Sequence, residues 1–148
     1  MISQKAKYAL RALVALAKQP PGSPTFIGDI AEDQKIPKKF LEQILLDLKH
    51  HGIVASKRGK AGGYGLLRPA DTISFGEVLR IIDGPIAPLP CLSKIAYRRC
   101  TDCKEESSCE VRRVFAQVAD ATRGVLDRTT IADAIGERLP PRLRDAVA

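Results

Sequence analysis

All four cysteines of this 148-residue chain lie within a 19-residue segment, from Cys91 to Cys109. Their spacing is Cys91-x8-Cys100-x2-Cys103-x5-Cys109. Cysteine thiolates ligate soft metals and iron–sulfur clusters, form disulfides and react with oxidants. The crowding therefore predicts a loop that binds a metal or cluster, forms disulfides or senses redox state.

The spacing leaves three chemical interpretations open. Structural zinc is usually held by two short Cys or His pairs, whereas this chain has one Cys-x2-Cys motif, with His50 and His51 far away in sequence. Disulfide switching or direct thiol modification needs only two or three cysteines. An iron–sulfur cluster tolerates irregular loop spacing, and four thiolates can ligate a [2Fe-2S] or a [4Fe-4S] cluster.

A thiol-redox protein that uses Cys100 and Cys103 is a further alternative. The motif does not lie between a strand and a helix of a βαβ unit. No nucleotide-binding glycine pattern or catalytic His/Asp set accompanies it. We therefore do not expect this protein to be an enzyme.

The composition indicates a soluble globular protein with either one ordinary core or a small module plus an oligomerisation element, since 45% of residues are hydrophobic and 28% are charged. No segment approaches the roughly 20 apolar residues that a membrane span needs, and no signal-peptide pattern is visible. We expect a cytoplasmic protein without a membrane partner, in which thiols stay reduced.

The net charge of +7 is concentrated in the first half of the chain. Residues 1–68 contain twelve Lys or Arg and five Asp or Glu, whereas residues 69–148 contain twelve of each. A basic half favours an anionic partner, and nucleic acid is the commonest candidate because neutralised phosphates release counterions. A merely solvated basic surface is the alternative.

Three amphipathic helices are predicted in the basic half, over residues 3–17, 27–34 and 37–50. The Pro- and Gly-containing segment 19–24 ends the first, and Thr25 is expected to cap the second. A short turn between the second and third helices is typical of a helix-turn-helix. The third helix should bury Phe40, Leu41, Ile44, Leu45 and Leu48.

The exposed face of the third helix carries candidate DNA-binding residues. Lys38 and Lys39 occupy its first turn, where positive charge opposes the helix dipole, so a phosphate or guanine edge there would compensate them. Glu42 and Gln43, one turn later, could read cytosine or adenine. The alternative is that Glu42 simply offsets the two lysines.

A glycine-rich hairpin is predicted next, with strands over 53–58 and 64–67. A hairpin directly after a helix-turn-helix is a wing. Its glycines let the backbone approach a ligand, and its cations can contact phosphates or enter the minor groove. The expected DNA contacts of the wing are Lys57, Arg58, Lys60, Gly62, Gly63 and Tyr64. An ordinary hairpin with solvated lysines is the alternative.

The second half is predicted to contain three capped helices. Residues 74–77 form a capping box, and residues 107–110 form another that places Cys109 in the first turn of a helix of about twenty residues. Thr130 is expected to begin a short terminal arm. The long helix carries a near-heptad apolar stripe that is too long for the core behind it, made of Val111, Val114, Phe115, Val118, Thr122, Val125 and Leu126.

The unpartnered stripe predicts a homodimer, whose twofold symmetry would match a near-palindromic operator. The alternative is a helix packed wholly on its own subunit. The cysteines then lie between a proline-rich lead-in and the start of the dimer helix. A chemical change at the cysteine loop could therefore affect the DNA-binding half of the chain.

The segments AKYALRALVALA, FLEQIL and RGKAGGYGL, followed by loop cysteines before a long helix, resemble the Rrf2 family of winged-helix regulators, which includes IscR, NsrR and RirA. The resemblance covers about residues 1–135. It implies a homodimeric DNA-binding regulator, usually a repressor, in which an iron–sulfur cluster often senses cluster status, iron, nitric oxide or redox state. By the same resemblance Glu42 matches a base-reading acidic residue and Arg58 the arginine that opens the wing.

The chain departs from the family at the fourth ligand. Cys103 and Cys109 match the last two cysteines of the usual triad, and the first could be Cys91 or Cys100. Arg112 stands where IscR-like members have a histidine, and Lys7 stands where NsrR-like members have a carboxylate. We hypothesise that Cys91, Cys100, Cys103 and Cys109 together ligate one cluster from a single subunit.

The expected fold is mostly α with a small β-hairpin wing: a winged helix-turn-helix domain plus a long dimerisation helix. A cluster-free thiol-based or small-molecule-responsive regulator of the same fold is the alternative function. The predicted segments are a DNA-binding domain (1–70), a connecting helix and lead-in (71–90), a cysteine-rich sensor loop (91–109), a dimerisation helix with terminal arm (110–135) and a flexible tail (136–148).

Overall fold

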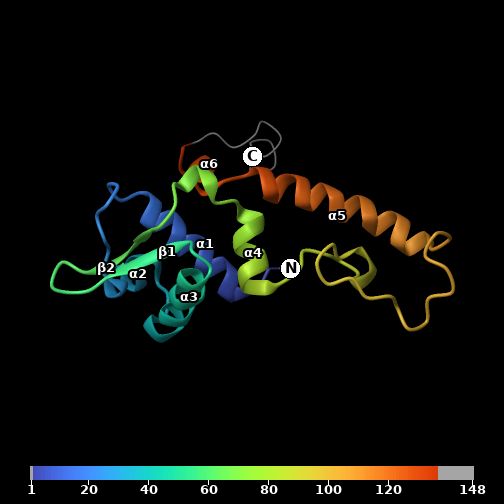
Figure 1. Cartoon of the computed structure of the whole chain (residues 1–148), viewed down its shortest axis with the longest axis horizontal. Coiled ribbons are helices and arrows are strands. Elements are labelled where there is room, and N and C mark those ends of the chain that lie inside the picture. Colours follow the sequence, from blue (N-terminus) through green and yellow to red (C-terminus); the bar gives the residue numbers. More distant parts are fainter. Residues whose placement is uncertain (1, 137–148) are drawn as a thin grey trace.

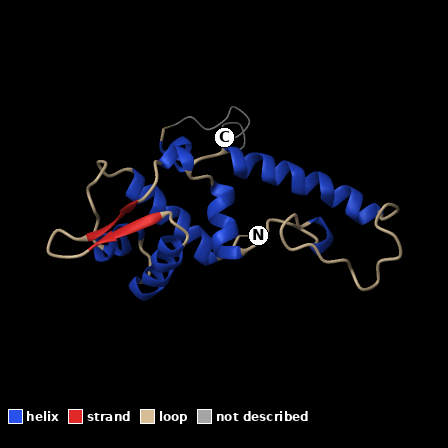
Figure 2. Ribbon diagram, viewed as in Figure 1, coloured by secondary structure: helices blue, strands red, loops and turns tan. Residues whose placement is uncertain are grey.

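The computed structural model of the chain, which describes residues 2–136, is mostly helical with one two-stranded antiparallel hairpin. Figures 1 and 2 show a head that contains the hairpin and most helices, and one long helix that extends away from it. The predicted fold class is therefore confirmed. The predicted tail, 136–148, lies outside the described residues except for Gly136.

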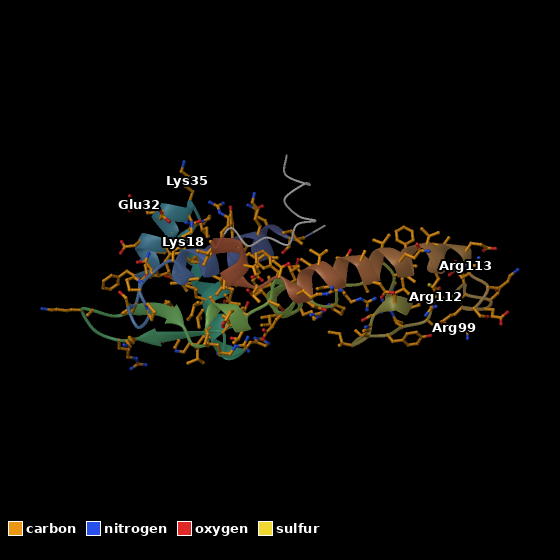
Figure 3. All side chains as sticks on the ribbon, turned by 90° about the horizontal axis from the view of Figure 1, so that it is seen from above. Lys18, Glu32, Lys35, Arg99, Arg112 and Arg113 are labelled. Atoms are coloured by element: carbon orange, nitrogen blue, oxygen red, sulfur yellow. The ribbon has the colours of Figure 1, made fainter. Side chains whose placement is uncertain are left out.

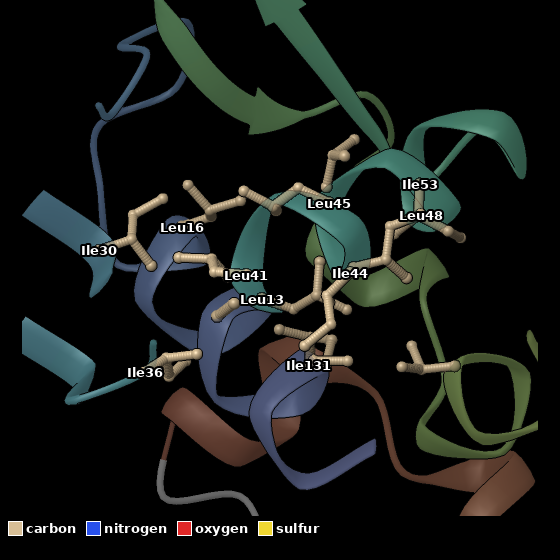
Figure 4. Packing of buried hydrophobic residues seen from close by; sticks show 14 of the residues in the cluster. Leu13, Leu16, Ile30, Ile36, Leu41, Ile44, Leu45, Leu48, Ile53 and Ile131 are labelled. Atoms are coloured by element: carbon tan, nitrogen blue, oxygen red, sulfur yellow. The ribbon is translucent and has the colours of Figure 1, made fainter. Parts of the chain in front are cut away.

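Helix α1 (Gln4–Ala17) is the centre of the head. Ser3 caps it, since its side-chain oxygen accepts a hydrogen bond from the Ala6 backbone N–H at 3.0 Å. The helix contacts α2, α3, α4, α6 and β2. Its fully buried small residues allow this close approach, whereas leucines fill the spaces between neighbours (Figure 4); the buried set is Ala6, Ala9, Ala12, Leu13 and Leu16.

Helices α2 (Ile27–Gln34) and α3 (Lys38–His50) form the predicted helix-turn-helix. Lys35, in the left-handed conformation with φ 53°, ends α2, and the buried Ile36 packs into the core beside it. Of the apolar residues expected inside α3, Phe40 is half-buried and contacts the Tyr8 ring edge-on. The other four are fully buried: Leu41, Ile44, Leu45 and Leu48.

The predicted Thr25 cap is wrong. Phe26 occupies the N-cap position of α2 without a side-chain hydrogen bond. Thr25 instead pairs with the wing, because its backbone N–H and C=O exchange two 2.8 Å hydrogen bonds with Tyr64. Thr25 therefore holds the segment that enters α2 against the wing and does not cap the helix.

The wing consists of strands β1 (Val54–Lys57), which is shorter than predicted, and β2 (Gly63–Leu66), which begins and ends one residue earlier than predicted. Val54 is opposite Leu66 and Lys57 is opposite Gly63. Lys49 near the end of α3 donates a 2.8 Å hydrogen bond to the Ser56 hydroxyl. The hairpin is therefore tied to α3 on one side and to Thr25 on the other.

Helix α4 (Phe75–Asp83) follows the short 3-10 helix η1 (Ala70–Thr72). The Ser74 side chain accepts a hydrogen bond from the Glu77 backbone N–H at 3.1 Å, as the predicted capping box requires. The other half of the box is absent, because the Glu77 carboxylate binds the Arg68 guanidinium at 2.7 and 3.1 Å. A charged partner thus outcompetes the backbone N–H of Ser74.

The chain then passes η2 (Pro90–Leu92), the cysteine loop, α5 (Glu110–Arg128) and α6 (Ile131–Ile135). The interpretation of α6 as a terminal arm is wrong. Ile131 is fully buried in the head core, and its backbone N–H donates to the Ile73 carbonyl at 2.9 Å. Thr130 and Asp133 form a complete capping box that starts this short helix.

An ion pair joins α5 to α4. The Arg80 guanidinium contacts both carboxylate oxygens of Asp127, at 2.7 and 3.0 Å. Gly76 makes room for this contact, since a Cβ there would lie 2.0 Å from Asp127 Oδ1. Hydrogen bonding to Arg80 lowers the pKa of Asp127, against an opposing effect of burial.

We expect Asp127→Asn to lower the free energy of unfolding at pH 7 by about 0.2–1 kcal/mol, the range for partly exposed ion pairs. Because the folded-state pKa of Asp127 is depressed, its contribution is present above the unfolded pKa of about 4 and is lost as the pH falls through the lower folded value. Urea denaturation at fixed protein concentration, at pH 7 and below pH ~4, measures both parts.

Asp120→Asn is the matched control, since Asp120 lies on the same helix but its side chain is 78% exposed. It should change stability little at either pH. An Asp127→Asn deficit of the same size at both pH values would contradict the role assigned to the ion pair.

Candidate nucleic-acid interface and cysteine loop

The first turn of α3 presents uncompensated positive charge. Lys38 and Lys39 are exposed, the turn contains no acidic residue, and Pro37 at the N-cap supplies no side-chain hydrogen bond. The free N–H groups of the turn add to this positive potential. Such a helix start can hold a phosphate or another anion.

Glu42 and Gln43 are also exposed, one turn further along α3, but their surroundings differ. The Gln43 amide donates a 3.1 Å hydrogen bond to Asp47, which also accepts one from Lys5 at 2.7 Å. The contact with Lys5 lowers the pKa of Asp47. Glu42 has no ion-pair partner within residues 2–136. Its carboxylate is therefore available to an external donor.

The wing presents three exposed cations, Lys57, Arg58 and Lys60. None of them forms an ion pair with another residue in the described part of the chain. Figure 1 shows α3 and the hairpin in the same head, at the opposite end of the molecule from the loop that precedes α5. The two elements that carry the predicted DNA-binding residues, α3 and the wing, thus lie in one head, and the cysteine loop lies apart from them.

Gly62, Gly63 and Tyr64 serve the packing of the wing itself. A Cβ on the buried Gly62 would lie 2.4 Å from the Lys57 carbonyl oxygen. A Cβ on Gly63, whose φ is 145°, would lie 2.4 Å from the Thr25 carbonyl oxygen. Tyr64 is half-buried and packs against the core. These three positions are explained by contacts within the protein, without a ligand.

The cysteine loop lies between η2 and α5. Cys91 is 6% exposed, the other three cysteines are half-buried, and all four are free thiols. Cys100 and Cys103 share a tight turn in which the Cys103 N–H donates to the Cys100 carbonyl at 3.2 Å. Burial, and then the neighbouring Cys91 thiol, raise the pKa of Cys100.

Cys109 is the N-cap of α5, so the prediction of a capping box at 107–110 is wrong. The Cys109 sulfur accepts a hydrogen bond from the Arg112 backbone N–H at 3.4 Å. The Ser107 hydroxyl donates instead to Glu105 at 2.7 Å. The thiol side chain itself thus starts the long helix.

Tyr97, Arg99 and Glu106, which the sequence did not single out, hold the loop together with Arg112. The Tyr97 hydroxyl donates to the Glu106 carboxylate, and this hydrogen bond raises the pKa of Tyr97. The Arg99 guanidinium donates to the Lys104 carbonyl at 2.9 Å, and Arg112 lies 3.8 Å from Glu106. Figure 3 shows Arg99 and Arg112 at the same end of the molecule. Their contacts follow no periodic pattern, so no sequence signal could have found them.

The four thiols have the donor chemistry of an iron–sulfur site. Within residues 2–136, however, no three His, Cys, Asp or Glu side chains are gathered closely enough to hold a metal ion. Cys91 and Cys100 are neighbours, whereas Cys109 is engaged at the start of α5. The four thiols are donors of the type that holds an iron–sulfur cluster. For all four to reach one cluster, the loop would have to close.

Helix α5 leaves most of its apolar stripe uncovered. Ala119 is the only buried residue among its 19. The exposed side of the helix carries large apolar side chains that are 40–59% exposed: Val111, Val114, Phe115, Val118 and Val125. No helix described within residues 2–136 is long and apolar enough to cross a membrane.

Comparison with known proteins identifies the family. The model of the Rrf2 family, described as iron-dependent transcriptional regulators, matches residues 2–137. An rrf2-like HTH-type transcriptional regulator of Rhodobacter capsulatus is 48% identical over an alignment of 144 residues that covers 95% of this chain and 95% of the relative.

Two solved structures share the fold. That of CymR, the global cysteine regulator of B. subtilis, has a TM-score of 0.77 and 32% identity, covering 93% of this chain and 97% of CymR. That of T. potens IscR has a TM-score of 0.73 and 26% identity, covering 93% of this chain and 88% of IscR. The chain belongs to the Rrf2 family of winged-helix transcriptional regulators and is a DNA-binding regulator rather than an enzyme.

Proposed function

We propose that this regulator acts in the cytoplasm as a homodimer, and that an iron–sulfur cluster held by the cysteine loop sets its affinity for a near-palindromic operator. One observation carries the proposal: all four cysteines lie in the loop whose last residue, Cys109, caps the long helix α5. Chemistry at these thiols therefore acts directly on an element that is joined to the DNA-binding head.

For DNA recognition we propose that α3 enters the major groove. Lys38 and Lys39 then contact phosphates or guanine, while Glu42 accepts from a cytosine amino group. Arg58 and its neighbouring lysines follow the adjacent backbone or minor groove. The exposure of these side chains and their lack of ion pairs within the described residues support this assignment. Gln43 has to give up its hydrogen bond to Asp47 if it reads a base.

We expect Arg58→Ala to weaken binding to a duplex selected from a random pool by about 1–3 kcal/mol, because a cation that reads a base or groove is lost. Binding should also fall steeply with salt. Fluorescence anisotropy over a range of salt concentrations measures both quantities. Lys94→Ala, at an exposed cation of the cysteine loop, is the matched control. Unchanged binding by Arg58→Ala would assign the wing to packing.

For assembly we propose that the α5 stripe packs against the same stripe of a second copy. The supporting observation is the row of half-exposed valines on a helix with one buried residue. Covering this row removes apolar area from water, which is favourable at about 25 cal/mol per Å². Two heads would then be held at a fixed separation, as two operator half-sites require.

We expect Val118→Lys to convert the protein from a dimer to a 16.1 kDa monomer, because a buried lysine in the interface lacks a partner. Sedimentation velocity at micromolar concentration measures the mass. Gln117→Lys, at the exposed neighbouring position, should remain dimeric. A monomeric wild-type protein would contradict the proposed assembly.

For sensing, the thiols of the loop would hold the cluster, which when bound supplies a centre whose stability depends on iron and on redox state. The chain's own residues would transmit a change at the thiols to the DNA-binding head. A change at Cys109 would alter the hydrogen bond that its sulfur accepts at the start of α5. The ion pair between Arg80 and Asp127 connects α5 to α4. Helix α4 in turn packs on α1.

A cluster-free thiol regulator is the second candidate. It is favoured by the proximity of Cys91 to Cys100 and by the lack of a gathered metal site within residues 2–136. The relative CymR, described as a global cysteine regulator, shares the fold. In this case, reaction of the thiols replaces cluster loss as the event that alters the start of α5.

We expect protein purified without oxygen to contain iron and to show a visible absorption band, and Cys100→Ser to lose that band if all four thiols are ligands. Thr101→Ser, an exposed position in the same loop, should keep it. An intact band in Cys100→Ser would exclude Cys100 as a ligand. Wild-type protein without iron or a band would favour the cluster-free candidate.

A further inference from the structure

A cavity of about 620 Å³ lies at the base of the wing, far from the cysteine loop. Its walls come from the end of α1, the segment between α1 and α2, both wing strands and the start of η1. In Figure 1 the α1–α2 segment approaches the hairpin. Residues of both segments line the cavity. This volume is within the range of small-molecule sites.

Prolines make the walls of this wing-base cavity rigid. Pro20, Pro21 and Pro24 line it on one side and Pro69 on another. The ring of proline fixes φ, so these segments have little freedom to collapse into the space. The two 2.8 Å backbone hydrogen bonds between Thr25 and Tyr64 hold the α1–α2 segment against β2. The cavity is therefore preformed.

Gly65 keeps the cavity open. Ala55 lies opposite Gly65 in the hairpin, and both line the cavity, so they share the same face of the wing. Unlike Gly63, Gly65 has no positive φ, and a Cβ there would meet no heavy atom within 4 Å. Neither backbone strain nor close packing requires a glycine at this position. The missing side chain leaves space that a leucine would fill.

The charged residues that line the cavity are both cations, Lys57 and Arg68, and no acidic residue lines it. Lys57 has no ion-pair partner among the described residues. Arg68 binds Glu77 through its two terminal nitrogens, which leaves its buried Nε–H without an acceptor. An apolar space with cations at its edge is complementary to an amphipathic anion.

We propose that the wing-base cavity binds a small organic acid, with its apolar body between the prolines and the hairpin and its carboxylate beside Lys57. This site is separate from the cysteine loop. It contacts the wing at a residue that is also assigned to DNA, so occupancy and DNA binding would be linked through Lys57. That link alone rests on the proposed DNA-binding function, and the binding site itself does not.

The test is a titration of the full-length protein, labelled with nitrogen-15, with 4-phenylbutyrate followed by amide NMR shifts. Saturable shifts at Ala55, Gly65 and Ala70 are expected. The neutral 4-phenylbutyramide should bind about tenfold more weakly, since it loses the charge-assisted contact. Gly65→Leu should abolish the shifts while keeping the melting temperature and DNA binding. Gly28→Ala, at a glycine of α2 with equally open surroundings, is the control and should bind normally.

Four outcomes would overturn the proposal. Shifts confined to the α5 stripe would identify nonspecific apolar binding. Equal affinity for acid and amide would remove the role of Lys57, and unchanged binding by Gly65→Leu would exclude the cavity. A change of the cavity amides on dilution of the protein alone would identify a second copy as the occupant. Because DNA binding is measured separately, failure here leaves the proposed DNA-binding function untouched.

Discussion

The packing of neighbours against the small residues of α1 is the constraint on which the head depends. Ala6, Ala9 and Ala12 are fully buried, so helices on several sides can approach the α1 backbone closely. This contact fixes α3 and the wing relative to each other, and it also receives α4 and α6 from the second half of the chain. The DNA-binding elements and the connection to the long helix therefore share one core.

Hydrophobic periodicity was enough to predict the helices and the wing. The apolar residues of α3 recur at helical spacing, and four of them are fully buried. Glycine and proline marked the turns because their backbone preferences do not depend on distant contacts. The crowding of cysteines on one loop was visible for the same reason, since it is a property of the sequence alone.

Features that depend on competition between partners could not be predicted. Thr25 can cap a helix, but its backbone pairs with Tyr64, and Glu77 prefers Arg68 to its own capping box. The thiol of Cys109 caps α5, whereas the Ser107 hydroxyl donates to Glu105. Likewise, the burial of Ile131 depends on how α6 returns to the head. Each outcome is decided by groups that are distant in sequence or by energy differences of about 1 kcal/mol.

The ion pair between Arg80 and Asp127 has a consequence for how the response to salt is interpreted. Both side chains are partly exposed, so dissolved ions screen their attraction. The same ions compete with a basic head for DNA phosphates. Salt therefore changes two properties at once: the counterions released from DNA, and the stiffness with which the long helix is attached to the head. In such a molecule, the slope of affinity against salt is not a simple count of phosphate contacts.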